Sequence, residues 1–190
     1  MKKIIAGVDE VGRGSLIGPV YAAAVILKER IDKKKLKDSK KLSKKNREIL
    51  NYYIKKNCIW AIASASIREI EKHNILNASL LAMKRAIIKL KKKPQLVLVD
   101  GNKLPKINNY NLKNIIKGDQ KIPEISAASI IAKVSRDKLI SKMGKNFKKY
   151  LWNKNSGYGT KGHIQAIKKF GITKYHRKTF RPVHNILSLR

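Results

Sequence analysis

Residues 4–14 read IIAGVDEVGRG, an apolar run followed by two adjacent acids and a glycine-rich turn. The apolar part has the length and composition of a buried strand, and Asp9 and Glu10 stand at its polar end. The turn places Arg13 between two glycines, which let the backbone bend and let its amides approach a ligand closely. A guanidinium at that point is a good partner for phosphate or carboxylate. We therefore interpret residues 4–14 as a strand that carries two carboxylates to a binding turn.

Two further acids stand at the ends of strand-like runs. Asp100 follows LVLV (96–99), and Asp119 follows IIKG (115–118). Acids are scarce in this chain, which has 12 Asp and Glu against 45 Lys and Arg. Three such runs, each ending in acid, predict one acidic spot on a basic surface. That spot would attract a divalent metal ion and the surrounding positive field a polyanion, so the pattern indicates phosphodiester chemistry.

The formal net charge of +33 and the pI near 10.4 indicate an anionic partner. A charge of this size implies affinity for nucleic acid, ribosomes or an anionic membrane. Only nine of the 45 basic residues are Arg, and an excess of Lys beside abundant Ile and Asn is also what drift in nucleotide composition produces. With the charge discounted for drift, we still favour a nucleic-acid partner.

The remaining composition is that of one folded domain. The chain has 190 residues with 43% hydrophobic content, enough for a real core. The single cysteine, Cys58, rules out an intramolecular disulfide and a multi-cysteine zinc site, and it fits a reducing cytoplasm. No run approaches the roughly 20 apolar residues that span a bilayer, and the first apolar run is too short for a secretory signal. We therefore expect a soluble, cytoplasmic protein that does not enter a membrane.

Hydrophobic periodicity predicts an α/β protein with a mixed sheet. Five segments have the composition or alternation of strands: 4–9, 20–27, 59–67, 96–100 and 112–117. Helical spacing and capping residues predict helices at 43–56, 77–90, 126–138, a further stretch to 150, and 163–170. We expect the residues after that last helix to form an irregular basic tail.

Several motifs have simpler alternatives. Gly12, Gly14 and Gly18 leave one residue too many for a dinucleotide-binding G-x-G-x-x-G, and a strand follows where that motif needs a helix. The pair Ser39-Lys40 could be a Ser-Lys nucleophile pair, but inside a basic segment we expect it to contact phosphate. The four histidines have no zinc-site spacing, so we expect surface or nucleic-acid-contacting roles for them.

The segment 157–159, Gly-Tyr-Gly, carries a tyrosine with little to pack against locally. Its ring is therefore available for stacking on a sugar or base. The alternative is that Tyr158 packs as a lid over the core.

Together these motifs closely resemble bacterial ribonuclease HII. The resemblance runs in order from about Ile4 to Leu187, nearly the whole chain. The blocks that carry it are GVDEVGRG (7–14), DSKKLS (38–43), LVDG (98–101), KGD (117–119), SAASIIAKVSRD (126–137) and GY (157–158) followed by His163. The resemblance implies a ribonuclease H-like α/β fold, with a five-stranded mixed sheet flanked by helices and a small C-terminal helical part.

The resemblance also implies the site residues. The family's catalytic, metal-binding acids fall on Asp9, Glu10, Asp100 and Asp119. Its glycine-arginine-glycine motif reads the ribose 2′-hydroxyl at an RNA–DNA junction, and its tyrosine stacks on the adjoining deoxyribose. The residues expected to bind substrate are Gly12, Arg13, Gly14, Ser39, Lys40 and Tyr158.

Two further positions are compared with the family pattern. Asp137 belongs to the family's Ala-Lys-Val-x-Arg-Asp block, and we expect a structural role for it beside the site. Many relatives carry His-Lys just before the Gly-Tyr pair, where this chain has Asn155 and Ser156. Residues 1–190 would then form a single catalytic domain, with 152–190 as its C-terminal, substrate-contacting part.

The function implied is hydrolysis of the RNA strand of RNA–DNA hybrids and nicking on the 5′ side of single ribonucleotides in duplex DNA. The products would carry 3′-hydroxyl and 5′-phosphate ends, which suits removal of ribonucleotides from DNA. Two Mg²⁺ or Mn²⁺ ions about 3.5–4 Å apart would activate water and stabilise the leaving oxygen. We expect a monomer whose partner is nucleic acid.

Two other classes of function remain open at this point. A non-catalytic nucleic-acid-binding or ribosome-associated protein would explain the charge, but not the placing of the acids. Another metal-dependent nuclease or phosphotransferase would explain the acids, but not the Gly-Arg-Gly and Gly-Tyr blocks together.

Overall fold

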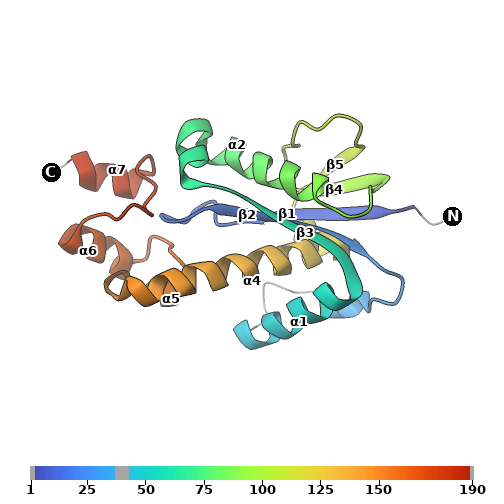
Figure 1. The fold of residues 1–190 in the computed structure, drawn as a ribbon, viewed down its shortest axis with the longest axis horizontal. Coiled ribbons are helices and arrows are strands. Elements are labelled where there is room, and N and C mark those ends of the chain that lie inside the picture. The colour runs from blue at the N-terminus through green and yellow to red at the C-terminus, as the bar shows by residue number, and fades with distance from the viewer. Residues whose placement is uncertain (1–2, 37–42, 189–190) are drawn as a thin grey trace.

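A five-stranded mixed sheet forms the centre of the protein, whose computed structural model describes residues 3–36 and 43–188. Its strands are β1 (Ile5–Val11), β2 (Val20–Leu27), β3 (Cys58–Ala65), β4 (Leu96–Asp100) and β5 (Leu112–Ile115). They lie in the order β3-β2-β1-β4-β5 (Figure 1). The first three are antiparallel neighbours, and β4 and β5 run parallel to β1. The mixed α/β sheet expected from the sequence is confirmed.

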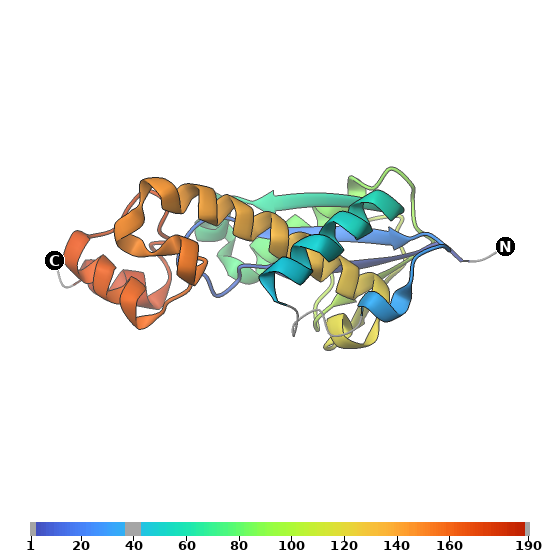
Figure 2. The same ribbon diagram turned by 90° about the horizontal axis from the view of Figure 1, so that it is seen from below.

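Three long helices cover the two faces of the sheet. Helix α2 (Ile67–Ile88) lies on one face, and α1 (Lys44–Asn57) and α4 (Pro123–Asn146) lie on the other (Figures 1 and 2). The short elements are the 3₁₀ turn η1 (Lys33–Leu36) and α3 (Gly118–Lys121). None of the helices in the described residues combines the length and the apolar character needed to cross a membrane.

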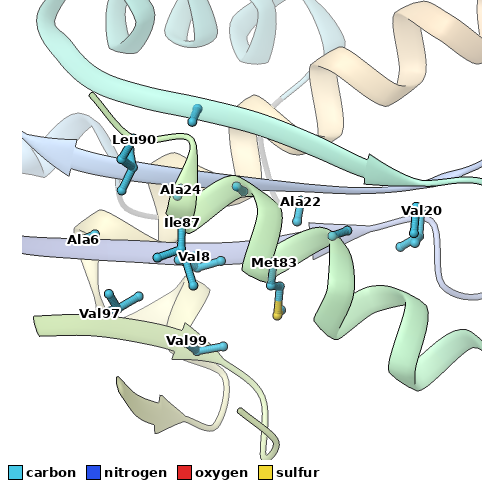
Figure 3. Close-up of a cluster of buried hydrophobic side chains, with 14 of the residues drawn as sticks. Ala6, Val8, Val20, Ala22, Ala24, Met83, Ile87, Leu90, Val97 and Val99 are labelled. Atoms are coloured by element: carbon cyan, nitrogen blue, oxygen red, sulfur yellow. The ribbon is translucent and has the colours of Figure 1, made fainter. Parts of the chain in front are cut away.

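Each face of the sheet has its own hydrophobic cluster. On the α2 face, alternate residues of the strands meet a stripe formed by Met83 and Ile87 of α2 and by Leu90, which follows the helix (Figure 3). That stripe belongs to the core, as its spacing of three and four residues indicates. On the other face, Ala23 and Val25 of β2 pack against residues of α1 and α4. The period of two in β2 therefore supplies both clusters.

Helix α4 approaches β1 very closely at Gly7. A Cβ atom added to Gly7 would lie 2.1 Å from the backbone carbonyl carbon of Glu124, so no larger residue fits there. The alanines and serines at the start of α4 are buried and small, which permits this approach. The consequence for the site is that Ser129, one turn along α4, comes within hydrogen-bonding reach of Asp9 on β1.

The C-terminal part packs against one end of the sheet. Its elements are η3 (Lys148–Tyr150), α5 (Trp152–Asn155), α6 (Lys161–Phe170) and α7 (Arg181–Ser188). Figure 1 shows α6 and α7 at the end of the molecule opposite the N-terminus. A third cluster joins these helices to Leu16 and Ile17, which follow β1, and to Ile140 of α4. The segment that contains Leu16 and Ile17 is thereby packed between α4 and the C-terminal helices.

Three sequence expectations about helices were wrong. Helix α2 begins at Ile67, not at residue 77, and is capped by Ser66 and Glu69. Its backbone leaves helical geometry at Asn74, whose side chain accepts from the Asn77 backbone N–H at 3.0 Å. Helix α4 is continuous to Asn146, and the expected irregular tail contains α7. Tertiary packing stabilises these additional helical turns, although the kink at Asn74 still divides α2.

Candidate active site

The four acids singled out in the sequence line one pocket of about 310 Å³. The pairing of β1 with β4 ends at Val8 and Val99, so Asp9 and Glu10 stand just beyond it, beside Asp100 at the last position of β4. Asp119 reaches the same pocket from α3, not from a strand end as the sequence suggested. The sheet thus brings together acids that are about 90 to 110 positions apart along the chain.

Hydrogen bonds orient two of these carboxylates. The Glu10 backbone N–H donates to Asp9 Oδ1 at 2.7 Å, and the Ser129 hydroxyl also bonds to Asp9. The Gly118 backbone N–H donates to Asp100 Oδ1 at 2.7 Å. The preceding residue, Lys117, has a left-handed backbone (φ 55°), which starts α3 and turns the Gly118 N–H toward Asp100. The acid side chains are therefore held by backbone geometry at the ends of regular elements.

Burial and mutual repulsion make the pocket electrostatically unfavourable. Burial raises the pKa of Asp9 well above its ordinary value, and the charges of Glu10 and Asp100 raise it further. Burial also raises the pKa of Glu10, while the Arg13 guanidinium, 3.2 Å away, opposes that rise. Three carboxylates are therefore buried together and held close enough to repel one another.

The chemistry of this donor set fits a divalent cation. Carboxylate oxygens are the ligands that Mg²⁺ and Mn²⁺ prefer, and a cation would relieve the repulsion among Asp9, Glu10 and Asp100. In residues 3–36 and 43–188, no three or more His, Cys, Asp or Glu side chains already stand in an arrangement that could hold a metal ion. Asp9, Glu10, Asp100 and Asp119 would hold such an ion, which would supply positive charge among them.

The turn after β1 is shaped by contact with a buried arginine. Gly12 has a positive φ of 93°, and a Cβ atom there would lie 2.1 Å from Arg136 Nε of α4. Any other residue would therefore be strained in its backbone and would displace the guanidinium. Arg13 itself is half exposed and points its guanidinium toward Glu10.

Two buried arginines bind the carbonyls of this turn. Arg136 donates from Nε to the carbonyl of Pro19 at 3.1 Å and from Nη2 to that of Ile17 at 3.0 Å. Arg177 donates from Nε to the Gly18 carbonyl at 2.9 Å and from Nη1 to the Arg13 carbonyl at 2.9 Å. Burial lowers the pKa of both guanidinium groups, that of Arg177 to about 9. The turn is therefore held by side chains more than 100 positions away.

Tyr158 lines the same pocket as the four acids. Its ring lies beside the turn, because a Cβ atom added to Gly14 would be 3.9 Å from Tyr158 Cε1. The Lys133 ammonium is 5.7 Å from the centre of the ring, within the range of a cation–π interaction. The ring thus faces the pocket between the acids and the glycine-arginine-glycine turn, and it does not act as a lid over the core.

The backbone of Tyr158 is fixed by His163 from α6. His163 Nδ1 is 2.9 Å from the Tyr158 carbonyl, and the Trp152 indole N–H donates to His163 Nε2 at 3.0 Å. Since Nε2 accepts, the ring proton is on Nδ1, which donates to Tyr158. Ser15 on the turn also donates to the neighbouring Gly157 carbonyl at 3.0 Å. Tyr158 is therefore tied both to the C-terminal helices and to the turn.

Comparison with known proteins agrees with this geometry. The family model for ribonuclease HII matches residues 6–184. The chain belongs to the ribonuclease HII family. It is 73% identical over 185 residues to ribonuclease HII from Pelagibacter ubique (strain HTCC1062), covering 97% of this chain and all of that protein.

Solved structures give the same result for the fold. The crystal structure of ribonuclease H2 from Pyrococcus horikoshii OT3 matches with a TM-score of 0.83 at 26% identity, over 97% of each chain. A structure of Bst-RNase HIII in complex with Mn²⁺ matches with a TM-score of 0.77 at 16% identity, over 98% of this chain and 70% of that one. The ribonuclease H-like fold is confirmed, and the chain is a ribonuclease H-family hydrolase.

Some residues of this ribonuclease HII site differ from the sequence expectations. His163 and His176 are fully buried, so the surface role expected for the histidines is wrong for these two; His73 and His184 are exposed. Asp137 pairs with Lys133 at 3.0 Å, in line with the structural role expected for it. Ser39 and Lys40 lie outside the described residues, so their predicted contact with substrate stays a prediction.

Asn155 and Ser156, where this chain departs from the family pattern, both accept hydrogen bonds that hold the Tyr158 loop. Asn155 Oδ1 accepts from the Gly157 backbone N–H at 2.8 Å, and the Ser156 carbonyl accepts from Arg136 Nη1 at 3.1 Å. Sequence reasoning missed the roles of Arg136, Arg177 and Ser129. The one available signal was the choice of Arg in a chain that mostly uses Lys, since a planar guanidinium can bind several carbonyls at once.

Proposed function

We propose that this ribonuclease HII family protein is a metal-dependent endonuclease that cuts the RNA strand of RNA–DNA hybrids and nicks duplex DNA 5′ to a single embedded ribonucleotide. The products carry 3′-hydroxyl and 5′-phosphate ends, which suits ribonucleotide excision repair. The observation that carries the proposal is that Asp9, Glu10, Asp100 and Asp119 share one pocket with Tyr158, beside the glycine-arginine-glycine turn.

The four acids are the proposed catalytic and metal-binding residues. They would hold Mg²⁺ or Mn²⁺, which when bound neutralises the scissile phosphate and supplies a polarised water. The chain's own contribution is to fix the carboxylates. Ser129 and the Glu10 N–H orient Asp9, and the Gly118 N–H orients Asp100. Because these partners sit on β1, α4 and the start of α3, the carboxylates keep their direction when the substrate enters.

Selection of a ribonucleotide rests on the turn and the tyrosine. Tyr158 lines the acid pocket, and its ring lies beside the turn formed by Gly12, Arg13 and Gly14, whose backbone groups would contact the sugar there. A site built to hydrogen-bond a 2′-hydroxyl leaves polar groups unpaired when a deoxynucleotide replaces it. Such unpaired groups can discriminate by a factor of about 10⁴ or more.

The rest of the proposal concerns the surroundings of the site. Residues 1–190 act as one catalytic domain, in which 152–190 contact the substrate through the loop that carries Tyr158. The positive charge of the surface supplies affinity for the nucleic-acid backbone. The protein works as a cytoplasmic monomer.

A panel of duplexes tests the proposal. With Mg²⁺ or Mn²⁺ present, the protein should nick DNA containing one ribonucleotide on its 5′ side, cut an RNA–DNA hybrid, and leave an all-DNA duplex intact. Tyr158→Ala should lose roughly 10- to 100-fold in rate on the single-ribonucleotide duplex, and Tyr158→Phe should lose less because its stacking face survives.

The outcomes separate the alternatives. A protein that binds every duplex but cuts none would be a non-catalytic binding protein. A protein that cuts the hybrid and ignores the single ribonucleotide would keep the hydrolase chemistry and remove the junction-reading role from Tyr158 and the turn. Cleavage of the all-DNA duplex at a similar rate would indicate a nuclease without 2′-hydroxyl selection.

A further inference from the structure

A second cavity opens next to the acid pocket, between the start of α1 and the C-terminal half of α4. Its volume is about 530 Å³, and Arg47 lines both this cavity and the acid pocket. Figure 2 shows α1 crossing α4 on this face of the sheet. The two hollows are therefore neighbours, with Arg47 at their shared border, and the second one runs along α4. We refer to this second cavity, between α1 and α4, as the α1–α4 groove.

The α1–α4 groove is lined mainly by cations. Its basic residues are Lys44, Arg47, Lys138, Lys142 and Lys145. Two acids also line it, Glu48 and Asp137, and the carboxylate of Asp137 is already paired with Lys133 at 3.0 Å. The charge of Lys138 also contributes, after burial, to lowering the pKa of Lys55, and Lys55 adds to the positive charge near the groove. A concave, cationic surface of this kind concentrates anions.

The lysines of α4 are spaced to follow a polyanion. Lys138, Lys142 and Lys145 are four and three residues apart, which places them on one face of the helix. They span about 10 Å along the helix axis, at about 1.5 Å per residue. One strand of B-form DNA advances about 3.4 Å along its axis for each phosphate, so a row of this length can contact more than one phosphate of a strand.

We propose that the α1–α4 groove binds the sugar–phosphate backbone of the substrate duplex beyond the cleaved nucleotide. This inference rests on the proposed function, because it assigns to that substrate a second contact area outside the acid pocket. Contacts in the groove are to phosphates, so they distinguish neither the base sequence nor ribose from deoxyribose. It sets how much duplex must extend from the ribonucleotide, on one side only, for full affinity.

The chain offers a matched control for this charge. Lys89, Lys91 and Lys92 are exposed and follow α2, which covers the opposite face of the sheet. Replacing either set of three lysines by Gln removes the same formal charge from a chain of net charge +33. Lys and Gln have similar helix propensities, so the α4 variant should keep its helix. Melting temperatures of both variants would verify this.

The first measurement is binding of an all-DNA duplex of about 30 base pairs as a function of salt, without metal, so that no cleavage is needed. The variant K138Q/K142Q/K145Q should reduce the slope of log affinity against log salt by about 2 to 3, at about 0.9 for each phosphate that the variant no longer neutralises. The control variant K89Q/K91Q/K92Q should leave the slope near that of the unaltered protein. Equal reductions in both variants, or no reduction in the groove variant, would overturn the proposal.

The second measurement uses cleavable duplexes shortened from one side of the ribonucleotide at a time. For the unaltered protein, KM should rise when the arm that lies in the groove is removed, and trimming the other arm should have little effect. The groove variant should raise KM roughly tenfold on the long duplex and be insensitive to that arm, because remote phosphate contacts act on ground-state binding. Sensitivity to both arms in the groove variant would assign the backbone contact elsewhere. Failure of the unaltered protein to cut any duplex would refute the proposed function, whereas the binding measurement would still decide on the groove.

Discussion

The acid pocket and the Tyr158 loop form two sides of one site, but they are stabilised in opposite ways. On the acid side, Asp9, Glu10 and Asp100 are placed by strand ends and repel one another. We call the other side the loop side; it consists of the Tyr158 loop and the turn after β1 that lies against it. There the buried side chains of Arg136 and Arg177 donate hydrogen bonds to backbone carbonyls of the turn. The first side stores unfavourable charge that a cation can relieve. The second side is held by hydrogen bonds within the protein.

The acid side is suited to binding a cation, and the loop side is suited to recognising a sugar. Groups that bind a metal ion gain stability when the ion neutralises their repulsion, and groups that recognise a sugar must hold their positions before the substrate arrives. Arg13 connects the two sides. Its side chain pairs with Glu10 of the acid pocket, and its backbone carbonyl accepts a hydrogen bond from Arg177. The two sides should therefore respond differently to substitution, metal and pH.

The largest effect is expected from Asp9→Asn. Cleavage should fall by more than about 100-fold, since even residues that only support a metal ligand cost up to that factor. In a metal-chelating buffer the same variant should melt at a higher temperature, because the amide removes a buried charge repelled by Glu10 and Asp100. Each kcal/mol relieved raises Tm by about 2–4 °C in a chain of this size. Calorimetry with and without Mn²⁺ measures both the gain in stability and the weaker response to the metal.

Asp32→Asn is the matched control, because Asp32 is an exposed acid remote from the pocket whose amide can still accept from the Lys34 N–H. It should change neither the melting temperature nor its response to Mn²⁺. A lower melting temperature for Asp9→Asn in the chelating buffer would mean that the acid side is stabilised by its charges, and the contrast between the two sides would disappear.

The sequence revealed the acid side far better than the loop side. Asp9, Glu10 and Asp100 could be predicted because an apolar run that ends in acid is a local pattern, and neighbouring parallel strands end at one edge. The stacking role of Tyr158 could also be proposed from its flanking glycines. Arg177 could not, because it bonds to the carbonyl of Arg13, 164 positions away, and no periodicity encodes such a contact.

Asp119 shows where local pattern fails on the acid side. Its apolar run ends in a residue with left-handed backbone, Lys117, and a single helical turn then carries the acid into the pocket. The strand expected to deliver it stops at Ile115. The position in the site was therefore predicted and the supporting element was not, because the turn depends on the hydrogen bond from Gly118 to Asp100.

An intermediate effect is expected from Arg177→Met. The change leaves the buried carbonyl of Gly18 and the partly buried carbonyl of Arg13 without their donors, at about 1–3 kcal/mol for each. The free energy of unfolding should fall by about 2–5 kcal/mol in denaturant titrations, with or without metal. Arg181→Met, an exposed residue of α7, should cost less than about 0.5 kcal/mol. An Arg177 variant that is destabilised only when metal is removed would show that the loop side depends on the acid side.

The smallest effect is the dependence of stability on pH. It distinguishes the two sides by sign through Asp9 of the acid pocket and His176, which pairs with Ile17 of the turn segment after β1. His176 is buried with Nδ1 accepting from the Thr173 N–H at 2.9 Å, so its proton is on Nε2, for which the described residues offer no hydrogen-bond partner. Burial, helped by the nearby His163, lowers the pKa of His176 to about 4. In the unfolded chain the value is about 6.5.

Between these two values the unfolded chain binds a proton that the folded protein does not. The free energy of unfolding should therefore fall as pH is lowered from about 6.5 to 4, by up to about 1.4 kcal/mol per pH unit, and this contribution should be constant above that window. Asp9 acts with the opposite sign, because a carboxylate with a raised pKa takes up its proton more readily in the folded protein.

Urea titrations at pH 7 and pH 5 should show a smaller decrease in stability for His176→Asn, which keeps an acceptor for Thr173, than for the unaltered protein. Asp9→Asn should show a larger decrease, because it removes the opposing gain. His73→Asn, at an exposed position, should follow the unaltered protein. If the free energy of unfolding of all these proteins fell equally between pH 7 and pH 5, neither buried group would control the acid response, and the two sides of the site would not differ in sign.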